Sequence, residues 1–438
     1  MSARTILDLW PDLVDSRTGI VREVKELLVD DDEPGFVHYL SYAGDTAAFG
    51  FLPNFGNNGG VATSAHGAIA KALGEAVERY CSALFRYEDL TWATYRDLTG
   101  PATDPAGFAL YDDAQYAQSG FPWRPFTAET TVAWVAGRSL VTGAATMVPA
   151  AFTFVPYHFQ RGRGDTPITQ PISTGLACGS SFDDAARSAL CEVVERDAFT
   201  RCWQARQGRP RIDTATLPAD LPRLIDRFTA VQLRVHLVDL TGDVGCPTVM
   251  SVVEGDTETS PAVAVAAACH PDPVAAARKS IEELAHTRKY AAQVMDHLPP
   301  VAVDVDGGHP AVDGQRAHLR FYCPPEAKEA ARFLWSGPDQ VDLTDLDRLP
   351  RGGADDLGDL GALVAAVAAT GEDVVAVDLT SPDVAELGLR VVRVVVPGFH
   401  PLQMGHANRC LGGTRLPRAL QEAGWPAGTD NPYPHPFP

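Results

Sequence analysis

The stretch Ala70-Lys-Ala-Leu-Gly-Glu75-Ala-Val-Glu78-Arg79 recurs later in the chain as Arg187-Ser-Ala-Leu-Cys-Glu192-Val-Val-Glu195-Arg196. In each copy the two glutamates are three residues apart, which places both carboxylates on one face of a helix. Carboxylate oxygens are the ligands that hard divalent cations prefer. The repeated pattern therefore predicts two helices whose carboxylates can hold metal ions.

A simpler interpretation applies to either copy alone. A glutamate followed four residues later by an arginine, such as Glu75 and Arg79, also supports an ordinary solvated helix through a salt bridge. Both copies, however, carry Ala-Leu on an otherwise apolar helix, where an exposed salt bridge is not the obvious purpose. The repetition favours the metal-binding interpretation.

Composition excludes several classes of protein. The chain has 438 residues, of which 45% are hydrophobic, so it can bury a substantial core. Its net charge of -20 argues against nucleic acid or an anionic membrane as a partner, because both require a basic surface. An acidic enzyme that uses cation-bridged phosphates is compatible with this charge.

The cysteines and the first residues point to a cytoplasmic protein. The eight cysteines show no C-x-x-C pair and no regular spacing, so they indicate neither a zinc site nor a disulfide framework. They are interpreted as core or surface residues, because none has an identifiable activating partner in the sequence. The residues from Met1 to Trp10 lack a signal-peptide core, and no apolar run approaches membrane-spanning length.

The first half of the chain combines short strands with glycine turns. Short strands are expected up to about Phe55, followed by the Gly/Asn loop 54–60, which could bring backbone amides to a ligand or be a plain turn. Residues 148–155 predict a strand, with Pro149 near its start or on a sheet edge. The turn 173–175 precedes the second glutamate helix, so strand, glycine turn and helix occur in both copies.

A third unit of strands and helix follows, and the remainder is mixed. Residues 247–253 and 262–266 predict strands, and a helix is expected from Pro273 to Arg288. Arg278 and Glu282 lie one turn apart on that helix, as in an ordinary surface salt bridge. Residues 299–357 are rich in Asp, Pro and Gly and predict loops or an insertion. The closing third predicts a helix at 360–367 and strands at 374–378 and 391–396.

The chain is therefore predicted to be mixed α/β (α+β), with repeated strand, glycine turn and helix units. We expect one domain over 1–438, with a core from about 13 to 425. Residues 426–438 form a tail in which alternating prolines forbid helix and enforce an extended conformation. A disordered tail is the alternative on composition alone.

Several of these segments together resemble the YcaO-domain family. They are Gly175-Leu-Ala-Cys-Gly179, the E-x-x-E-R-D run ending at Asp197, Val396-Pro-Gly398 and Gly405-His-Ala-Asn-Arg-Cys-Leu-Gly-Gly413. The resemblance spans about Leu13 to Pro438, and the C-terminus Pro434-His-Pro-Phe-Pro438 is similar to that of the azoline-forming cyclodehydratases. It implies a YcaO-like fold around a nucleotide site.

The resemblance implies a site for ATP and Mg²⁺ without a Walker loop. The implied metal ligands are Glu75, Glu78, Glu192 and Glu195. The implied nucleotide-binding residues are these glutamates with Arg278, Glu282, Ser180 and Asp184. Lys71 stands where the family usually has Ser and could instead touch a phosphate, and Thr174 stands where azoline-formers often have Asn.

The resemblance also implies a reaction. A Cys, Ser or Thr side chain of a ribosomally made precursor peptide attacks the preceding carbonyl, ATP phosphorylates the oxyanion, and phosphate leaves to give a thiazoline or oxazoline. The C-terminal carboxylate of Pro438 is implied to help catalysis, held by the stiff strut of Pro434 and Pro436. His400, His406, Asn408 and Arg409 would support the site, although a lone histidine is more often structural.

The chain enters the YcaO-like region near Leu13, so a separate leader-binding partner protein is expected beside the precursor peptide and its leader. A homodimer is left open. The alternatives are an ATP-dependent thioamide or amidine former, against which the proline terminus argues, and a non-catalytic scaffold. The intact glutamates argue against the scaffold, because clustered negative charge serves no purpose without a ligand.

Overall fold

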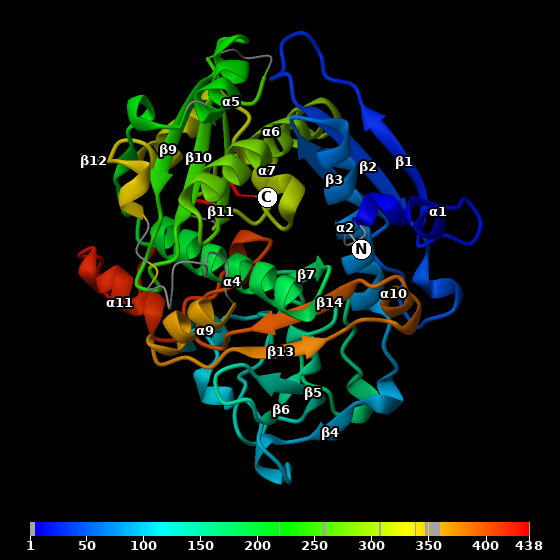
Figure 1. The fold of residues 1–438 in the computed structure, drawn as a ribbon. Helices are drawn as coiled ribbons and strands as arrows, with labels where there is room; N and C mark the ends of the chain where they lie inside the picture. Colours follow the sequence, from blue (N-terminus) through cyan, green and yellow to red (C-terminus); the bar gives the residue numbers. More distant parts are fainter. Residues whose placement is uncertain are drawn as a thin grey trace. The chain divides into compact units, whose positions relative to one another are not determined.

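The computed structural model describes residues 5–218, 220–256, 260–305, 308–337, 339–346, 349 and 360–437 (Figure 1). The chain divides into two compact units, each made of separate segments. The first comprises Met1–Leu27, Val37–Val193 and Asp359–Phe399, and the second comprises Leu28–Phe36, Val194–Gly358 and His400–Pro438. The expectation of a single domain stays a prediction.

The first unit contains two antiparallel sheets. One has the order β1-β2-β3, with β1 Val21–Leu27, β2 Val37–Ala43 and β3 Asn57–Ala62. The other has the order β4-β5-β13-β14-β7, with β6 paired to β5. Its strands are β4 Thr91–Ala93, β5 Val132–Ser139, β6 Ala145–Pro149, β7 Leu176–Gly179, β13 Val375–Asp378 and β14 Arg390–Val395. The α-helices of this unit are α1 Trp10–Leu13, α2 Ala65–Ala83, α3 Asp113–Tyr116, α9 Leu360–Ala368, α10 Pro382–Glu386 and the first part of α4 Phe182–Gln204.

Helix α2 packs against both sheets of the first unit. Leu73 and Ala76 pack with residues of β1 and β2, whereas Val77 and Tyr80 pack with residues of β7 and β14. Ser64 begins the helix, because its side-chain oxygen accepts a hydrogen bond from the N–H of Gly67. The first glutamate pair is therefore carried by a helix that is fixed on two sides.

The second unit is built on one mixed sheet with the order β11-β10-β9-β8-β12. Its strands are β8 Arg211–Ile212, β9 Arg234–Asp239, β10 Thr248–Glu254, β11 Val263–Cys269 and β12 Gln340–Val341. Its α-helices are α5 Asp220–Thr229, α6 Pro273–His297, α7 Gln315–Phe321, α8 Lys328–Ala331, α11 Arg415–Glu422 and the second part of α4.

Alternate residues of β10 bury opposite faces of this sheet. Met250 and Val252 belong to the core cluster that contains Phe199 and Trp203 of α4. Ser251, between them, donates to the carbonyl of Ser280 in α6 at 2.8 Å. The sheet is thus covered by α4 on one face and by α6 on the other.

Most of the predicted elements are confirmed. The strands at 247–253, 262–266, 374–378 and 391–396 correspond to β10, β11, β13 and β14. The helices at 273–288 and 360–367 correspond to α6 and α9, and α6 continues to His297. The three predicted pairs of a strand followed by a helix are also present, as β3 and α2, β7 and α4, and β11 and α6.

The Gly/Asn loop expected at residues 54–60 is in part a strand. Residues Asn57 to Gly60 are not a turn but the first part of β3, where they pair with β2 from Tyr42 to Tyr39. A Cβ on Gly60 would lie 2.0 Å from the carbonyl oxygen of Ala68 in α2. The glycine therefore allows the strand to approach the helix, which its turn-like composition concealed.

Two further expectations are wrong in part. The strand predicted at 148–155 ends at Pro149, at the end of edge strand β6 rather than at its start, and a 3-10 helix occupies Ala150–Phe152. Proline has no N–H to extend the ladder, and the N–H groups of Thr153 and Phe154 bond back to Ala150. The segment 299–357 contains α7, whose Phe321 is in the core.

Candidate functional site

Helix α2 presents two glutamates whose carboxylates are held by backbone amides. Oε2 of Glu75 accepts a hydrogen bond of 2.8 Å from the N–H of Gly59, and its Oε1 pairs with Arg79 at 3.2 Å. Oε1 of Glu78 accepts a hydrogen bond of 2.9 Å from the N–H of Cys178. The ordinary Glu-to-Arg salt bridge is thus present in this copy, and each of the two carboxylates also accepts a hydrogen bond from a backbone N–H.

Helix α4 also has two glutamates whose carboxylates accept hydrogen bonds from backbone amides. Oε2 of Glu192 accepts a hydrogen bond of 3.0 Å from the N–H of Gly175, and Oε2 of Glu195 accepts one of 3.2 Å from the N–H of Cys269. Arg196 pairs with Glu195 at 3.2 Å.

The backbone donors of the two glutamate pairs follow the same order along the chain. The first glutamate of each pair accepts from the strand region before its own helix, which is Gly59 for Glu75 and Gly175 for Glu192. The second glutamate accepts from a strand later in the chain, which is β7 for Glu78 and β11 for Glu195. Fixing one oxygen of a carboxylate in this way orients the other, as supporting hydrogen bonds do around metal ligands.

In the first compact unit, the negative charges of Glu75 and Glu192 act on the carboxylate of Glu78. Burial, together with the carboxylates of Glu75 and Glu192, raises the pKa of Glu78 to about 8, although Arg79 and the amide of Cys178 act in the opposite direction. The buried carboxylate of Glu78 therefore lies near two others, where added positive charge would favour its ionised form. A divalent cation would supply that charge, so these residues fit Mg²⁺.

Arg393 is a residue of this region that the sequence analysis missed. Its side chain is 3% exposed, and no hydrogen-bond acceptor for its Nε or Nη1 lies among the described residues. Burial lowers the pKa of Arg393 to about 10, Glu192 opposes this effect and Arg79 adds to it. The signal was a single charge within the valine-rich strand 391–396.

The other expected nucleotide-binding residues belong to both compact units. Lys71 lies on α2 four residues before Glu75, on the same face. The N–H and hydroxyl of Ser180 both donate to Asp184, which also pairs with Arg187 at 2.7 Å. In the second unit Arg278 pairs with Asp220 of α5, and Glu282 is buried on α6.

The residues near the C-terminus are mostly buried in the second unit. Pro434 and Pro436 are buried, whereas Pro438 lies outside the described residues. His400 and His406 are buried, and burial lowers their pKa values to about 4 and about 2. These values favour the structural role for both histidines.

Two further residues of this region make structural contacts. Asn408 donates to the carbonyl of Met404 at 3.0 Å, and Arg409 pairs with Asp430 at 2.7 Å. A support of the site by His400, His406, Asn408 and Arg409 stays a prediction.

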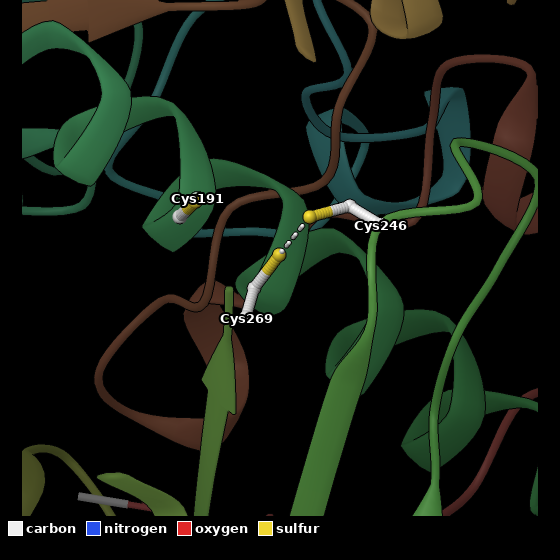
Figure 2. Close-up of side chains that lie close together, drawn as sticks. All are labelled: Cys191, Cys246 and Cys269. Carbon is white, nitrogen blue, oxygen red and sulfur yellow. Dashed lines mark hydrogen bonds between the residues drawn. The ribbon is translucent and has the colours of Figure 1, made fainter. Parts of the chain in front are cut away.

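The cysteines, which the sequence left as core or surface residues, are mostly buried. All eight are free thiols, seven of them buried and Cys178 partly buried. Figure 2 shows Cys269 at the end of β11, whose thiol donates to the sulfur of Cys246 at 3.3 Å. Cys191, also drawn there, belongs to α4 in the first unit. Cys269 thus contacts Glu195 through its backbone amide and Cys246 through its thiol.

Comparison of the chain with models of known protein families identifies its family. Residues 59–400 match a family model described as YcaO cyclodehydratase, binding ATP and Mg²⁺. The chain belongs to the YcaO family. This match confirms the family, ATP and Mg²⁺ that the resemblance implied. Among curated relatives, an uncharacterised protein of Methanothermobacter thermautotrophicus is 29% identical over 81% of this chain and 83% of its own length.

Solved YcaO structures share the fold. A heterocyclase in complex with substrate and cofactor has a TM-score of 0.77 at 22% identity, covering 98% of this chain. The chain spans 56% of the length of that heterocyclase. YcaO from Methanopyrus kandleri, bound with AMPPCP and Mg²⁺, has a TM-score of 0.61 at 24% identity, covering 87% of this chain and 86% of its own. These likenesses confirm the mixed α/β YcaO fold.

None of the helices in the described part of the chain combines the length and the hydropathy that a membrane-spanning segment needs.

Proposed function

We propose that this YcaO protein is an ATP-dependent cyclodehydratase acting on a ribosomally made precursor peptide in the cytoplasm. A Cys, Ser or Thr side chain of the peptide adds to the preceding carbonyl carbon. The carbonyl oxygen accepts the γ-phosphoryl group of ATP, and ADP and inorganic phosphate leave as the thiazoline or oxazoline forms. The net change in the peptide is the loss of one water per ring.

The observation that carries this proposal is the shared arrangement of the four glutamates. Each has one carboxylate oxygen bonded to a backbone N–H, in two helices of similar sequence. A solvated salt-bridge helix has no need for such bonds, whereas orientation of carboxylates serves metal binding. The family description, which includes ATP and Mg²⁺, supports the same role.

The roles proposed for the site residues follow from their chemistry. Glu75, Glu78, Glu192 and Glu195 would hold Mg²⁺, which would neutralise charge on the phosphates of ATP. The further nucleotide-binding residues would be Lys71, Ser180, Asp184, Arg278 and Glu282. Of these, Arg278 and Lys71 supply positive charge for phosphate oxygens.

The nucleophile must also lose a proton. We propose that the C-terminal carboxylate of Pro438 takes it, since a positioned carboxylate can act as a general base. Pro434 and Pro436 restrict the conformations of the tail and so reduce the entropy lost in holding that carboxylate in place. A separate leader-binding protein would deliver the precursor peptide through its leader.

Mg²⁺-dependent ATP binding, measured by calorimetry, tests the metal site. The native chain should bind, and Glu78→Gln and Glu195→Gln should each weaken binding at least tenfold, since glutamine keeps the shape but loses the charge that holds Mg²⁺. Glu422→Gln, an exposed partner of Arg418, is the matched control and should bind as the native chain does. Equal binding by all three variants would rule out Glu78 and Glu195 as ligands.

Mass spectrometry of the precursor peptide then separates the reactions. Incubation with ATP, Mg²⁺ and the leader-binding protein should remove one water for each ring formed. Replacement of an amide oxygen by sulfur would indicate the thioamide alternative instead. A native chain that binds no ATP even with its partner present would indicate the scaffold.

A further inference from the structure

The C-terminal tail lies in the core of the second unit although it cannot form a sheet. Every second residue from Pro432 to Pro436 is a proline without an N–H, so the tail has few donors for a strand ladder. Yet His435 and Phe437 are only 5% and 3% exposed. Its buried carbonyl oxygens must therefore find donors elsewhere, because an unpaired buried carbonyl is costly.

Three side chains donate to three successive carbonyls of the tail. Nε1 of Trp203 donates to the carbonyl of Tyr433 at 3.1 Å, and the hydroxyl of Tyr322 donates to that of Pro434 at 2.6 Å. Nδ1 of His318 lies 2.8 Å from the carbonyl of His435.

The tautomer of His318 follows from its second partner. Its Nε2 accepts a hydrogen bond of 3.1 Å from the N–H of Gly405, so the single ring proton of the neutral side chain is on Nδ1. Burial lowers the pKa of His318 well below its usual value, which keeps the ring neutral. His318 therefore donates to the tail.

The two ends of this segment are also fixed. The side chain of Asn431 donates to the carbonyl of Trp203 at 3.0 Å. At the other end the guanidinium of Arg196 lies 4.4 Å from the ring centroid of Phe437, and Arg196 also pairs with Glu195. The last described residue of the tail thus contacts the neighbour of a proposed metal ligand.

We propose that Trp203, His318 and Tyr322 are positioning residues that hold the C-terminal tail by its carbonyl oxygens. By doing so they set where the chain presents its terminal carboxylate to the peptide. This inference rests on the proposed function only for its catalytic consequence. The docking itself concerns the folded chain alone.

Apolar burial of Phe437 and the prolines offers a different explanation of the docked tail. If burial alone held the tail, removal of one hydroxyl would leave its docking unchanged. If the donors hold it, Tyr322→Phe leaves the carbonyl of Pro434 buried without its partner and shifts the tail toward the undocked state.

Hydrogen exchange of the full-length chain distinguishes these explanations. From residue 431 to the end of the chain, only Asn431, Tyr433, His435 and Phe437 carry backbone amide protons. Tyr322→Phe should lower the protection of the last three by about fivefold, the effect of one net hydrogen bond. The matched control is Tyr87→Phe, which removes a hydroxyl bond of 2.9 Å to the carbonyl of His158 in the first unit and should leave tail exchange unchanged. Native exchange of the tail in Tyr322→Phe would overturn the inference.

Steady-state kinetics with ATP and the precursor peptide test the catalytic consequence. Tyr322→Phe should lower kcat by about fivefold or more, because small misplacements of reacting groups are costly, and should leave the KM for ATP within about twofold. Faster tail exchange with native kcat would overturn the positioning role. A native chain that forms no rings would refute the proposed function, while the exchange result would still decide how the tail is held.

Discussion

The guanidinium of Arg196 lies 4.4 Å from the ring centroid of Phe437, two residues that are 241 positions apart in the chain. Arg196 also pairs with Glu195, whose other oxygen accepts from Cys269. The side chain of Arg196 therefore connects the proline-rich tail with Glu195, a proposed metal ligand.

This contact should be measurable as an energetic coupling. A double-mutant cycle of Arg196→Met and Phe437→Leu, in urea unfolding, should give a coupling free energy of about 1 kcal/mol, because a cation–π contact away from water is worth that much. Leucine keeps most of the buried apolar area and so isolates the ring. Additive effects of the two substitutions would show that the ring and the guanidinium merely adjoin.

The buried carboxylate of Asp197 is expected to be essential for stability. It accepts from Arg201 at 2.9 Å, from Arg415 at 2.9 Å and from the N–H of His400 at 3.0 Å, and it is 1% exposed. Asp197→Asn keeps the shape but leaves Asp243 as the remaining carboxylate partner of Arg201 and Arg415. The loss of two charge-assisted hydrogen bonds should lower the free energy of unfolding by about 3 kcal/mol.

The control for Asp197 is an exposed ion pair, Arg418 with Glu422, whose side chains are 80% and 59% exposed. Arg418→Gln should change the free energy of unfolding by less than about 0.5 kcal/mol. Urea unfolding measures both variants, and a similar small loss in both would contradict the role given to Asp197.

The stability of the chain should fall in mild acid through His400. Burial lowers the pKa of His400 to about 4, and the nearby Arg201 and Arg415 lower it as well, against Asp197. The unfolded state therefore takes up a proton near pH 6.5, before the folded state does near pH 4. Stability is complete above pH 6.5 and is lost as the pH falls through this interval, by at most about 3 kcal/mol.

His400→Gln isolates this contribution, because its side-chain oxygen can replace the Nε2 that accepts from the N–H of Leu416 at 3.1 Å. Unfolding free energies measured between pH 4 and pH 7 should decline less steeply for this variant than for the native chain. Parallel pH profiles for the two proteins would refute the assignment to His400.

Two glycines near the first glutamate pair should respond to alanine in opposite ways. A Cβ on Gly60 would lie 2.0 Å from the carbonyl oxygen of Ala68 and 2.6 Å from the nitrogen of Ala72, so Gly60→Ala should cost about 3 kcal/mol. A Cβ on Gly74, inside α2, would meet nothing within 4 Å, so Gly74→Ala should stabilise by about 0.5–1 kcal/mol. Thermal unfolding compares them, and equal melting temperatures would contradict the close packing of β3 on α2.

The local elements of this protein could be predicted from its sequence, because local patterns specify them. The spacing of Glu75 and Glu78, like that of Glu192 and Glu195, depends on helix periodicity alone. The valine-rich strands β10 and β14 and the helix α6 follow from composition and period in the same way. Combined with short motifs, these patterns were sufficient to indicate the YcaO family.

The tertiary structure alone decided what those elements contact. Glu78 and Cys178 are 100 residues apart, and Glu195 and Cys269 are 74 apart, so no local pattern reveals their hydrogen bonds. The burial of Arg393 depends on neighbours from distant segments. The need for a glycine at position 60 depends on the helix packed against it. Sequence spacing fixes which residues share a face, whereas strand register and long-range packing fix which amide or side chain lies opposite that face.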